Sequence, residues 1–279
     1  MSRKRDPGPI GWTWRWVLFV VAALILNLPV VFTVFTSFKT NADINASPPV
    51  WLFAPTLQHY AEVLTTPTLN FPRYLMNSFV LAAAGTAIAL ILAVPAAYAI
   101  VRMKFGGGTI VPIVLMLRTL PLVIFAIPFY FMFQWLGLLD TRLGLSIIAA
   151  IINLPFALLF AIAMVRDLPY EIEEAARVDG AGIGMLLWRI VIPLGRPMLI
   201  SIAILSFIYA WNEFLFGLIL TTRSATPVTV GATLFATSFG IRWGPTSAAM
   251  VLSLLPPMLV GLVCFRYLTR ALTAGAIKG

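Results

Sequence analysis

The amino-acid sequence predicts an all-α integral membrane protein with six transmembrane helices. Hydrophobic residues make up 61% of the 279 residues and charged residues only 10%, whereas a soluble domain carries roughly a quarter charged residues. The chain therefore lacks the polar side chains that would cover a water-facing surface, and lipid is the natural solvent of its exterior. Six long apolar stretches, separated by turn-forming residues, give the number of spans.

The limits of the spans follow from hydropathy and from helix-breaking residues. The first apolar stretch is too long for the core of a cleaved signal peptide, so we expect it to be retained as a helix. No polar stretch is long enough for a soluble domain, and we interpret residues 1–279 as a single transmembrane domain. The predicted spans are residues 13–38, 73–101, 110–136, 144–165, 198–220 and 246–268.

The distribution of basic residues predicts the orientation. Most of the 19 Lys and Arg residues lie on the side of the membrane that holds the N-terminus, so both termini are predicted to be cytoplasmic. These residues are scattered between spans and form no basic stripe, so the net charge of +9 does not indicate nucleic acid as a partner. The single cysteine, Cys264, excludes an intrachain disulfide, and the single histidine, His59, is expected at the surface of the first outer loop.

The long cytoplasmic segment, residues 166–197, is predicted to begin with a short helix. Pro169 suits the first turn of a helix, and the acidic residues at 171–174 complement its positive end. Arg177 falls near the opposite end, and Gly180 is placed to terminate the helix in a left-handed conformation.

A second, amphipathic helix is predicted from Ile183, and Pro193 is expected to stop it. The small residues Ala175, Ala176 and Gly182 leave the segment before it with little side-chain bulk. Two interpretations fit this pattern: a slim helix that inserts into a cleft of another protein, or an ordinary surface helix between two spans.

The order Glu174-Ala175-Ala176, Gly180, Ile190 and Ile192-Pro193 resembles the EAA loop of importer permeases in the ATP-binding-cassette (ABC) superfamily. Ile192 departs from the pattern, because leucine is usual at that position. The resemblance implies that the first helix of the loop is a coupling helix that docks into a cleft on a separate ATPase subunit. The ATPase-docking residues that it implies are Glu173, Glu174, Ala175, Ala176, Arg177, Asp179 and Gly180.

Further short matches resemble the maltose-type branch, which imports sugars and polyols; they are Leu57-Gln58-His59-Tyr60, Asn77-Ser78, Ala210–Phe214 and Gly275–Gly279. They imply the type I ABC importer permease fold in the bacterial cytoplasmic (inner) membrane, and a C-terminal tail similar to one that reaches toward the ATPase interface. The implied partners are a second permease subunit that makes a heterodimer, two nucleotide-binding ATPase subunits, and a periplasmic or lipid-anchored solute-binding protein. The implied cargo is a sugar, a polyol or a sugar derivative.

The chain has no recognisable nucleotide site. A phosphate-binding loop needs a glycine-rich turn followed by Lys and Ser or Thr. The turn Gly106-Gly107-Gly108 has no such lysine after it. We therefore predict a non-catalytic subunit with no metal or cofactor of its own, and the resemblance places ATP and Mg²⁺ on the partner ATPase.

Polar residues inside spans are candidates for a substrate path. Arg118 lies about eight residues into the third span, roughly 12 Å from its start, where a charge costs at least ~2.5 kcal/mol on insertion scales. The fifth span carries its polar residues on one helical face. The candidate path residues are Asn77, Arg118, Asn153, Ser206, Tyr209, Asn212 and Glu213.

These path residues have structural alternatives. The asparagines can instead staple kinked helices to one another, and Arg118 can pair with Glu213 or with the partner subunit. If Arg118 faces the path, an anionic sugar derivative becomes a candidate cargo.

Two other functions remain open from the sequence. The EAA loop is shared with importers of polyamines, amino acids and phosphonates, which work by the same alternating access. An ion-coupled secondary transporter would need intramembrane carboxylates or an inverted repeat, and Glu213 is the one acidic residue placed inside a predicted span.

Overall fold

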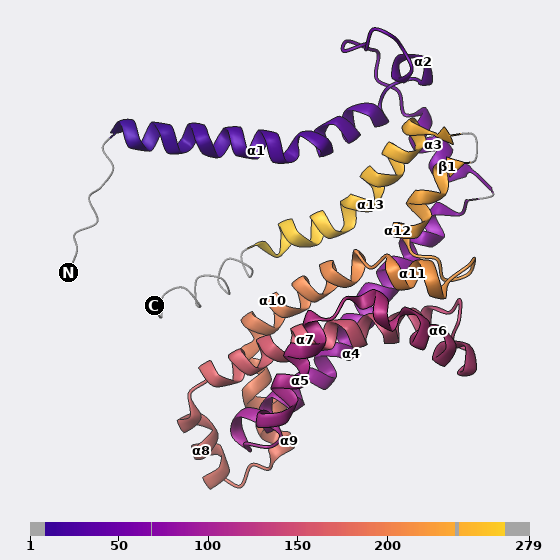
Figure 1. The fold of residues 1–279 in the computed structure, drawn as a ribbon. Coiled ribbons are helices and arrows are strands. Elements are labelled where there is room, and N and C mark those ends of the chain that lie inside the picture. The colour runs from indigo at the N-terminus through magenta and orange to yellow at the C-terminus, as the bar shows by residue number, and fades with distance from the viewer. Residues whose placement is uncertain (1–8, 68, 238–239, 266–279) are drawn as a thin grey trace. The chain divides into compact units, whose positions relative to one another are not determined.

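The computed structural model describes residues 9–67, 69–237 and 240–265, and helices form most of this part of the chain (Figure 1). The terminal motif Gly275–Gly279 lies outside the described residues. The helical segments are α1 (Pro9–Ser37), α2 (Asn41–Ile44), α3 (Gln58–Thr65), α4 (Phe71–Arg102), α5 (Gly107–Thr119), η1 (Leu122–Phe125), α6 (Ala126–Trp135), α7 (Arg142–Asp167), α8 (Tyr170–Val178), α9 (Ile183–Leu186), η2 (Leu187–Val191), α10 (Ile192–Trp211), α11 (Leu215–Leu220), α12 (Val228–Gly231), η3 (Ala232–Phe235) and α13 (Trp243–Val263). The strands β1 (Ala236–Thr237) and β2 (Gly240–Ile241) form an antiparallel pair.

The chain divides into two compact units. Unit 1 comprises residues 1–66 and 235–252, and unit 2 comprises residues 67–234 and 253–279. Helix α13 begins in unit 1 and ends in unit 2. All candidate site residues named above belong to unit 2.

The described residues contain five helices long and apolar enough to cross a membrane: Trp14–Ser37, Phe71–Arg102, Arg142–Asp167, Ile183–Trp211 and Trp243–Val263. The number rises to six when α5 and the η1–α6 segment, which are bent by 100° at a short break, are counted together as one span. The prediction of an all-α chain with six apolar spans is confirmed, and the third span is broken.

The break in the third span lies at Leu120 and Pro121, which both have extended backbone. Proline has no N–H to donate to the preceding turn, and its ring disfavours the helical conformation of the residue before it. Helix α5 therefore ends at Thr119, and the helical path restarts in a new direction at Leu122.

Unit 2 is built on α4, α7 and α10. Helices α4 and α7 run in the same direction, because Asn77 and Arg142 meet near their first turns while Arg102 and Leu168 meet at their last turns. Helix α10 packs against both in the opposite direction. These three helices supply most of the buried apolar core of unit 2.

Small residues let α4 and α7 approach closely, as in other membrane helix pairs. A β-carbon at Gly85 would lie 2.7 Å from the β-carbon of Ala149 and 3.3 Å from the backbone oxygen of Ser146. Further fully buried alanines line the same contact, namely Ala89, Ala93, Ala97, Ala157 and Ala161. The backbones of the two helices are therefore separated by little more than hydrogen and methyl groups.

The helix that begins at Ile183 does not stop at Pro193, which corrects the prediction. Helix α9, the π-helical η2 and α10 form one helical run, Ile183–Trp211. Pro193 lies in the first turn of α10, directly after the π turn. The π turn shifts the hydrogen-bond register, and a proline is tolerated where the following α segment begins because no donor is needed there. The fifth span consequently begins earlier than residue 198.

The fifth span also ends earlier than predicted, at Trp211, and α11 follows as a separate short helix. Glu213 lies in the break. Its Oε1 accepts a hydrogen bond from the backbone N–H of Phe216 at 2.6 Å, and its backbone oxygen accepts one from the Thr229 hydroxyl at 2.6 Å. Glu213 thus satisfies an amide at the start of α11 that has no partner within the helix.

Asp140, in the loop between α6 and α7, ties this loop to residues 222–225. Its carboxylate accepts hydrogen bonds from all four backbone N–H groups of that segment at 2.8–3.3 Å. Burial alone would raise the pKa of Asp140, but the amides of Ala225, Ser224, Arg223 and Thr222 stabilise the charged form and lower the pKa to about 2.

His59 is fully buried in unit 1, which corrects the expectation of a surface residue. Its Nε2 lies 2.9 Å from the backbone oxygen of Lys39, and its Nδ1 lies 3.9 Å from a carboxylate oxygen of Glu62. The imidazole ring leaves no room for a side chain at Gly244, and Glu62 also pairs with Arg242. His59 is therefore a packing residue that joins α3 to the start of α13.

We expect Gly85→Leu to destabilise the protein by about 1–3 kcal/mol or more, because the new side chain must force α4 away from α7. The measurement is the Tm of the purified protein in detergent. Gly261→Leu in α13 is the matched control, since a β-carbon there meets nothing within 4 Å. Equal melting temperatures for the two variants would contradict the close contact of α4 and α7.

Asp140→Asn is expected to remove an acid-sensitive contribution to stability. Because folding lowers the pKa of Asp140 from 3.8 to about 2, the carboxylate stabilises the fold above the higher value and loses this effect as the pH falls toward the lower one. The Tm of the wild type should exceed that of the variant near neutral pH, and the difference should shrink between about pH 4 and about pH 2. Glu171→Gln controls for the loss of one negative charge. A difference that is constant with pH would count against the ionised clamp.

Candidate functional site

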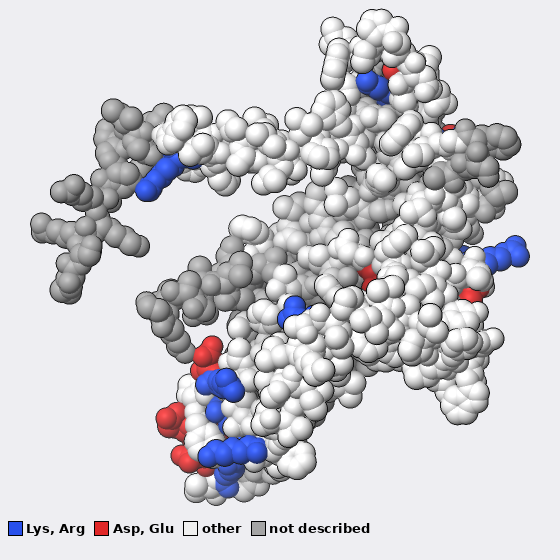
Figure 2. Space-filling view, viewed as in Figure 1, with Lys and Arg blue, Asp and Glu red and all other residues white. Residues whose placement is uncertain are grey.

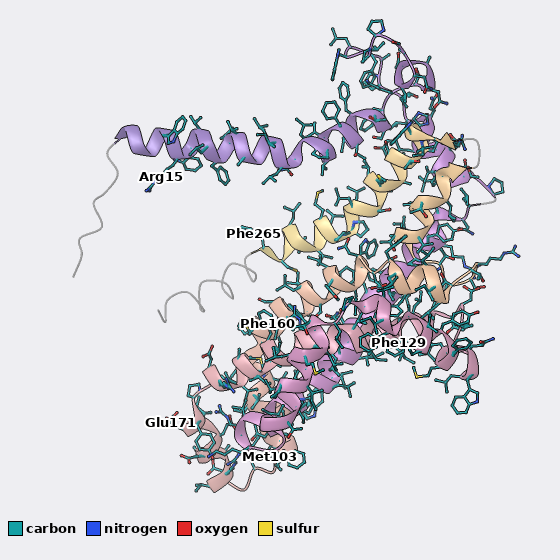
Figure 3. The ribbon with its side chains drawn as sticks, viewed as in Figure 1. Arg15, Met103, Phe129, Phe160, Glu171 and Phe265 are labelled. Carbon is teal, nitrogen blue, oxygen red and sulfur yellow. The ribbon has the colours of Figure 1, made fainter. Side chains whose placement is uncertain are left out.

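Charged side chains gather at one end of unit 2, over α8 and α9, whereas most of the surface seen in Figure 2 carries few charges. Glu171 on α8 and Met103, just after the end of α4, lie at this end (Figure 3). The predicted docking residues all lie in or directly after α8.

Helix α8 has the ends that its sequence predicts. Its first turn carries acidic residues, and Arg177 lies in its last turn. Gly180 has a positive φ of 87°. The N–H of Gly180 donates to the oxygen of Arg177 at 3.0 Å, and the N–H of Ala181 donates to the oxygen of Ala176 at 2.9 Å. This is the paired hydrogen-bond pattern of a left-handed helix terminus, and the predicted role of Gly180 in ending the helix is confirmed.

A buried ion pair fixes α8 to the end of α4. Arg102 Nε donates to Glu173 Oε1 at 2.8 Å, and its terminal nitrogen donates to the backbone oxygen of Leu168 at 2.7 Å. Glu173 is only 1% exposed. Glu173 was included in the predicted docking set, but its carboxylate points into its own chain.

A second arginine completes this attachment. The guanidinium of Arg177 donates to the hydroxyls of Tyr98, on α4, and Tyr170, on α8, at 3.2 and 3.0 Å. The guanidinium groups of Arg102 and Arg177 both lie over the Tyr170 ring, at 5.3 and 5.6 Å from its centroid. Sequence analysis did not assign a role to Arg102 or Tyr98. The one feature of the sequence that pointed to Arg102 was its place at the very end of a predicted span, and the bias of basic residues toward the cytoplasm already explained that place.

The outward surface of α8 and its terminus is narrow and partly apolar. We call this surface the docking face; it consists of Glu174, Ala175, Val178, Asp179 and Gly180, all of which are exposed. Val178 is 88% exposed, which is unusual for a β-branched apolar side chain on a charged loop. An apolar centre with polar groups at its rim is the arrangement found in protein–protein interfaces.

Asn77 forms hydrogen bonds with its own chain. Its Nδ2 donates to the backbone oxygens of Ser224 and Thr226 at 3.1 and 2.9 Å, and its Oδ1 accepts from Arg142 Nε at 2.7 Å. The side chain therefore joins the first turns of α4 and α7 to the segment before α12. This is the stapling role that was the alternative to a place in the path.

Asn153 and Ser206 lie where α7 crosses α10. Both are fully buried, and Asn153 Nδ2 donates to the backbone oxygen of Ser206 at 2.8 Å. With Glu213 at the start of α11, these residues hold elements of unit 2 together and do not line the cavity described next.

The other three predicted path residues share one cavity of about 620 Å³. Arg118 enters it from α5, and Tyr209 and Asn212 enter it from the end of α10. Phe129, on α6, marks one wall in Figure 3. The remaining lining is apolar: Leu117, Leu120, Leu122, Phe125, Phe129, Ile151, Ile152, Pro155, Phe156, Leu205 and Ile208. Sequence analysis could not single out these residues, because every span is rich in the same residue types.

Solved structures with this fold include one described as a bacterial ABC transporter involved in the import of the acidic polysaccharide alginate. One of its chains superposes with a TM-score of 0.79 at 24% sequence identity, over 96% of this chain and 98% of that chain. A chain of the MetNI methionine ABC transporter superposes with a TM-score of 0.60 at 14% identity, over 74% of this chain and 98% of that chain. These superpositions confirm that this single chain has the type I importer permease fold that the sequence resemblance implied.

Curated relatives are similar over nearly their whole length. The trehalose/maltose transport system permease protein MalG of Thermococcus litoralis is 36% identical over 263 residues, which cover 93% of this chain and 94% of the relative. The sulfoquinovosyl glycerol transport system permease protein SmoH of Agrobacterium fabrum is 30% identical over 267 residues, which cover 94% of this chain and 93% of the relative.

The family described as the inner membrane component of binding-protein-dependent transport systems matches residues 85–274, which include all of unit 2 from the middle of α4 to α12. The match contains both the docking face and the cavity. This chain belongs to that family of transport-system membrane components.

Proposed function

We propose that this chain is one of two membrane-spanning subunits of an ATP-driven importer for a sugar, a polyol or a sugar derivative. Family membership supports transport that depends on a binding protein. The names of the relatives support the cargo class, since they include transport systems for trehalose/maltose, sulfoquinovosyl glycerol and diacetylchitobiose. The solute-binding protein delivers the cargo, and this chain forms part of the path across the membrane.

In this proposal the α8 end of unit 2 faces the cytoplasm, and the Asp140 end faces the outside of a bacterial inner membrane. The bias of Lys and Arg toward the side of the N-terminus supports this orientation. The charges around α8 in Figure 2 are consistent with it, because that end would lie in water. Both termini are then cytoplasmic.

The observation that carries the proposal is the attachment of α8 to α4. The docking face contacts an ATPase subunit, and Arg102 and Arg177 hold α8 against the end of α4. When two ATPase subunits close on ATP and Mg²⁺, a displacement of α8 reaches α4 through these side chains. Because α4 packs closely on α7 along its length, the two helices move together.

Alternating access then requires that some spans change shape while others stay rigid. In unit 2 the helical path is interrupted at residues 120–121, within the third span, and at residues 212–214, between α10 and α11. Breaks of this kind are where backbone dihedral changes cost least. We place the reorientation of α5 relative to α6, and of α10 relative to α11, at these two points. The second permease subunit closes the remaining side of the path.

We expect Glu174→Lys to lower ATP-driven uptake by about tenfold or more, because a reversed charge at a docked helix costs several kcal/mol of association. The measurement uses proteoliposomes that contain both permease subunits, the ATPase subunits and the binding protein. Membrane insertion of the variant should be normal, since Glu174 is exposed.

Glu171→Lys is the matched control for this experiment. It makes the same charge change on the same helix, but outside the EAA-like pattern, and it should retain uptake and co-purification with the ATPase. Normal uptake by the Glu174→Lys complex would reject docking through this face.

A further inference from the structure

We propose that the cavity between α5, α7 and α10 binds the anionic group of an acidic saccharide, a carboxylate or a sulfonate, through Arg118. This inference rests on the proposed function, because it names the charge class of the imported cargo. It assigns Arg118 a ligand rather than a structural partner.

Arg118 has no acidic partner in the part of unit 2 that the structure describes. The buried carboxylate of Glu173 pairs with Arg102 and not with Arg118. Glu213, the partner that the sequence offered for Arg118, is turned toward the amide of Phe216 instead. The contact that Arg118 does make is with an aromatic ring, since its guanidinium carbon lies 5.8 Å from the centroid of Phe156.

A guanidinium at this position needs an anion or water. Arg118 lies in the last turn of α5, within a broken span. A charge inside a membrane span is costly unless it faces a watery path or an opposite charge. Its planar fork of N–H donors matches the oxygen pairs of carboxylate and sulfonate groups. The cavity lining contains no acidic residue, so no negatively charged side chain of that lining opposes an anion.

The rest of the cavity suits a sugar ring. Phe125, Phe129 and Phe156 offer apolar aromatic surface for the C–H faces of the ring. Tyr209 and Asn212 offer a hydroxyl and an amide oxygen for sugar hydroxyls, while the Asn212 amide nitrogen is engaged with the oxygen of Ile208. A volume of about 620 Å³ falls in the usual range of small-ligand sites. An apolar wall with one cation and two neutral polar groups selects a ligand with one charge and several hydroxyls.

The test measures ATP-driven uptake by the complete complex in proteoliposomes, with its binding protein. The probes are size-matched saccharides in three forms: neutral, with one uronic acid carboxylate, and with one sulfonate. We expect the wild type to take up an acidic form faster than its neutral counterpart. Arg118→Gln should reduce uptake of the acidic form by about tenfold or more, the effect of losing one hydrogen bond to a charged group. Arg118→Lys keeps the positive charge but loses the planar pair of N–H donors. Its uptake of the acidic form should lie between that of the wild type and that of Arg118→Gln.

The ratio of acidic to neutral uptake is the decisive quantity. Arg166→Gln, which removes an exposed arginine at the end of α7 outside the cavity, should leave this ratio unchanged. A wild-type preference for the neutral forms, or an equal loss of acidic and neutral uptake in an assembled Arg118→Gln complex, would overturn the inference and leave the proposed function standing. If Arg118→Gln fails to assemble, Arg118→Lys takes its place, and an equal loss of acidic and neutral uptake in that complex would overturn the inference. Absence of ATP-driven uptake for every saccharide would instead overturn the proposed function.

Discussion

The ion pair between Arg102 and Glu173 is the interaction on which the connection between α8 and the membrane helices depends. Glu173 is almost completely buried, and removing one member of a buried pair typically costs about 3–5 kcal/mol because the other charge is left uncompensated. The pair is therefore strongly coupled to the position of α8. A short helix between two spans would otherwise be held only by its connecting segments, and here the ion pair also ties it to α4.

This attachment separates two kinds of residue within one short motif. Glu173 and Arg177 face their own chain, whereas Glu174 and Val178 face outward. Helical periodicity explains the division, since neighbours in sequence lie about 100° apart around a helix. The surface that we propose to engage another protein and the surface that is fixed to α4 can therefore share the nine residues of α8 without competing for the same side chains.

The sequence predicts structure correctly where the structure is determined by neighbouring residues or by contact with lipid. Apolar length predicts the spans, and Pro169 and Gly180 predict the limits of α8, because a proline and a left-handed glycine act on their own turn. The sequence does not predict structure that depends on contacts between segments far apart in the chain or on an irregular helical turn. His59 is buried because the oxygen of Lys39 and the missing side chain of Gly244 receive its ring. The helix continues through Pro193 because a π turn precedes it. No pattern of residue types in the sequence predicted that turn.

The polar residues of the spans look alike in the sequence, but the structure separates those that bond within the fold from those that line the cavity. Asn77, like Arg118, is a polar residue inside an apolar span, yet its amide bonds to two backbone oxygens and to Arg142. Its hydrogen-bonding capacity is used by the fold. Arg118 has five N–H donors and, within the described residues, a ring face as its contact. A group whose bonds are satisfied internally stabilises the bundle, and a charged group whose bonds are not satisfied, at the wall of a cavity, is available to whatever enters that cavity.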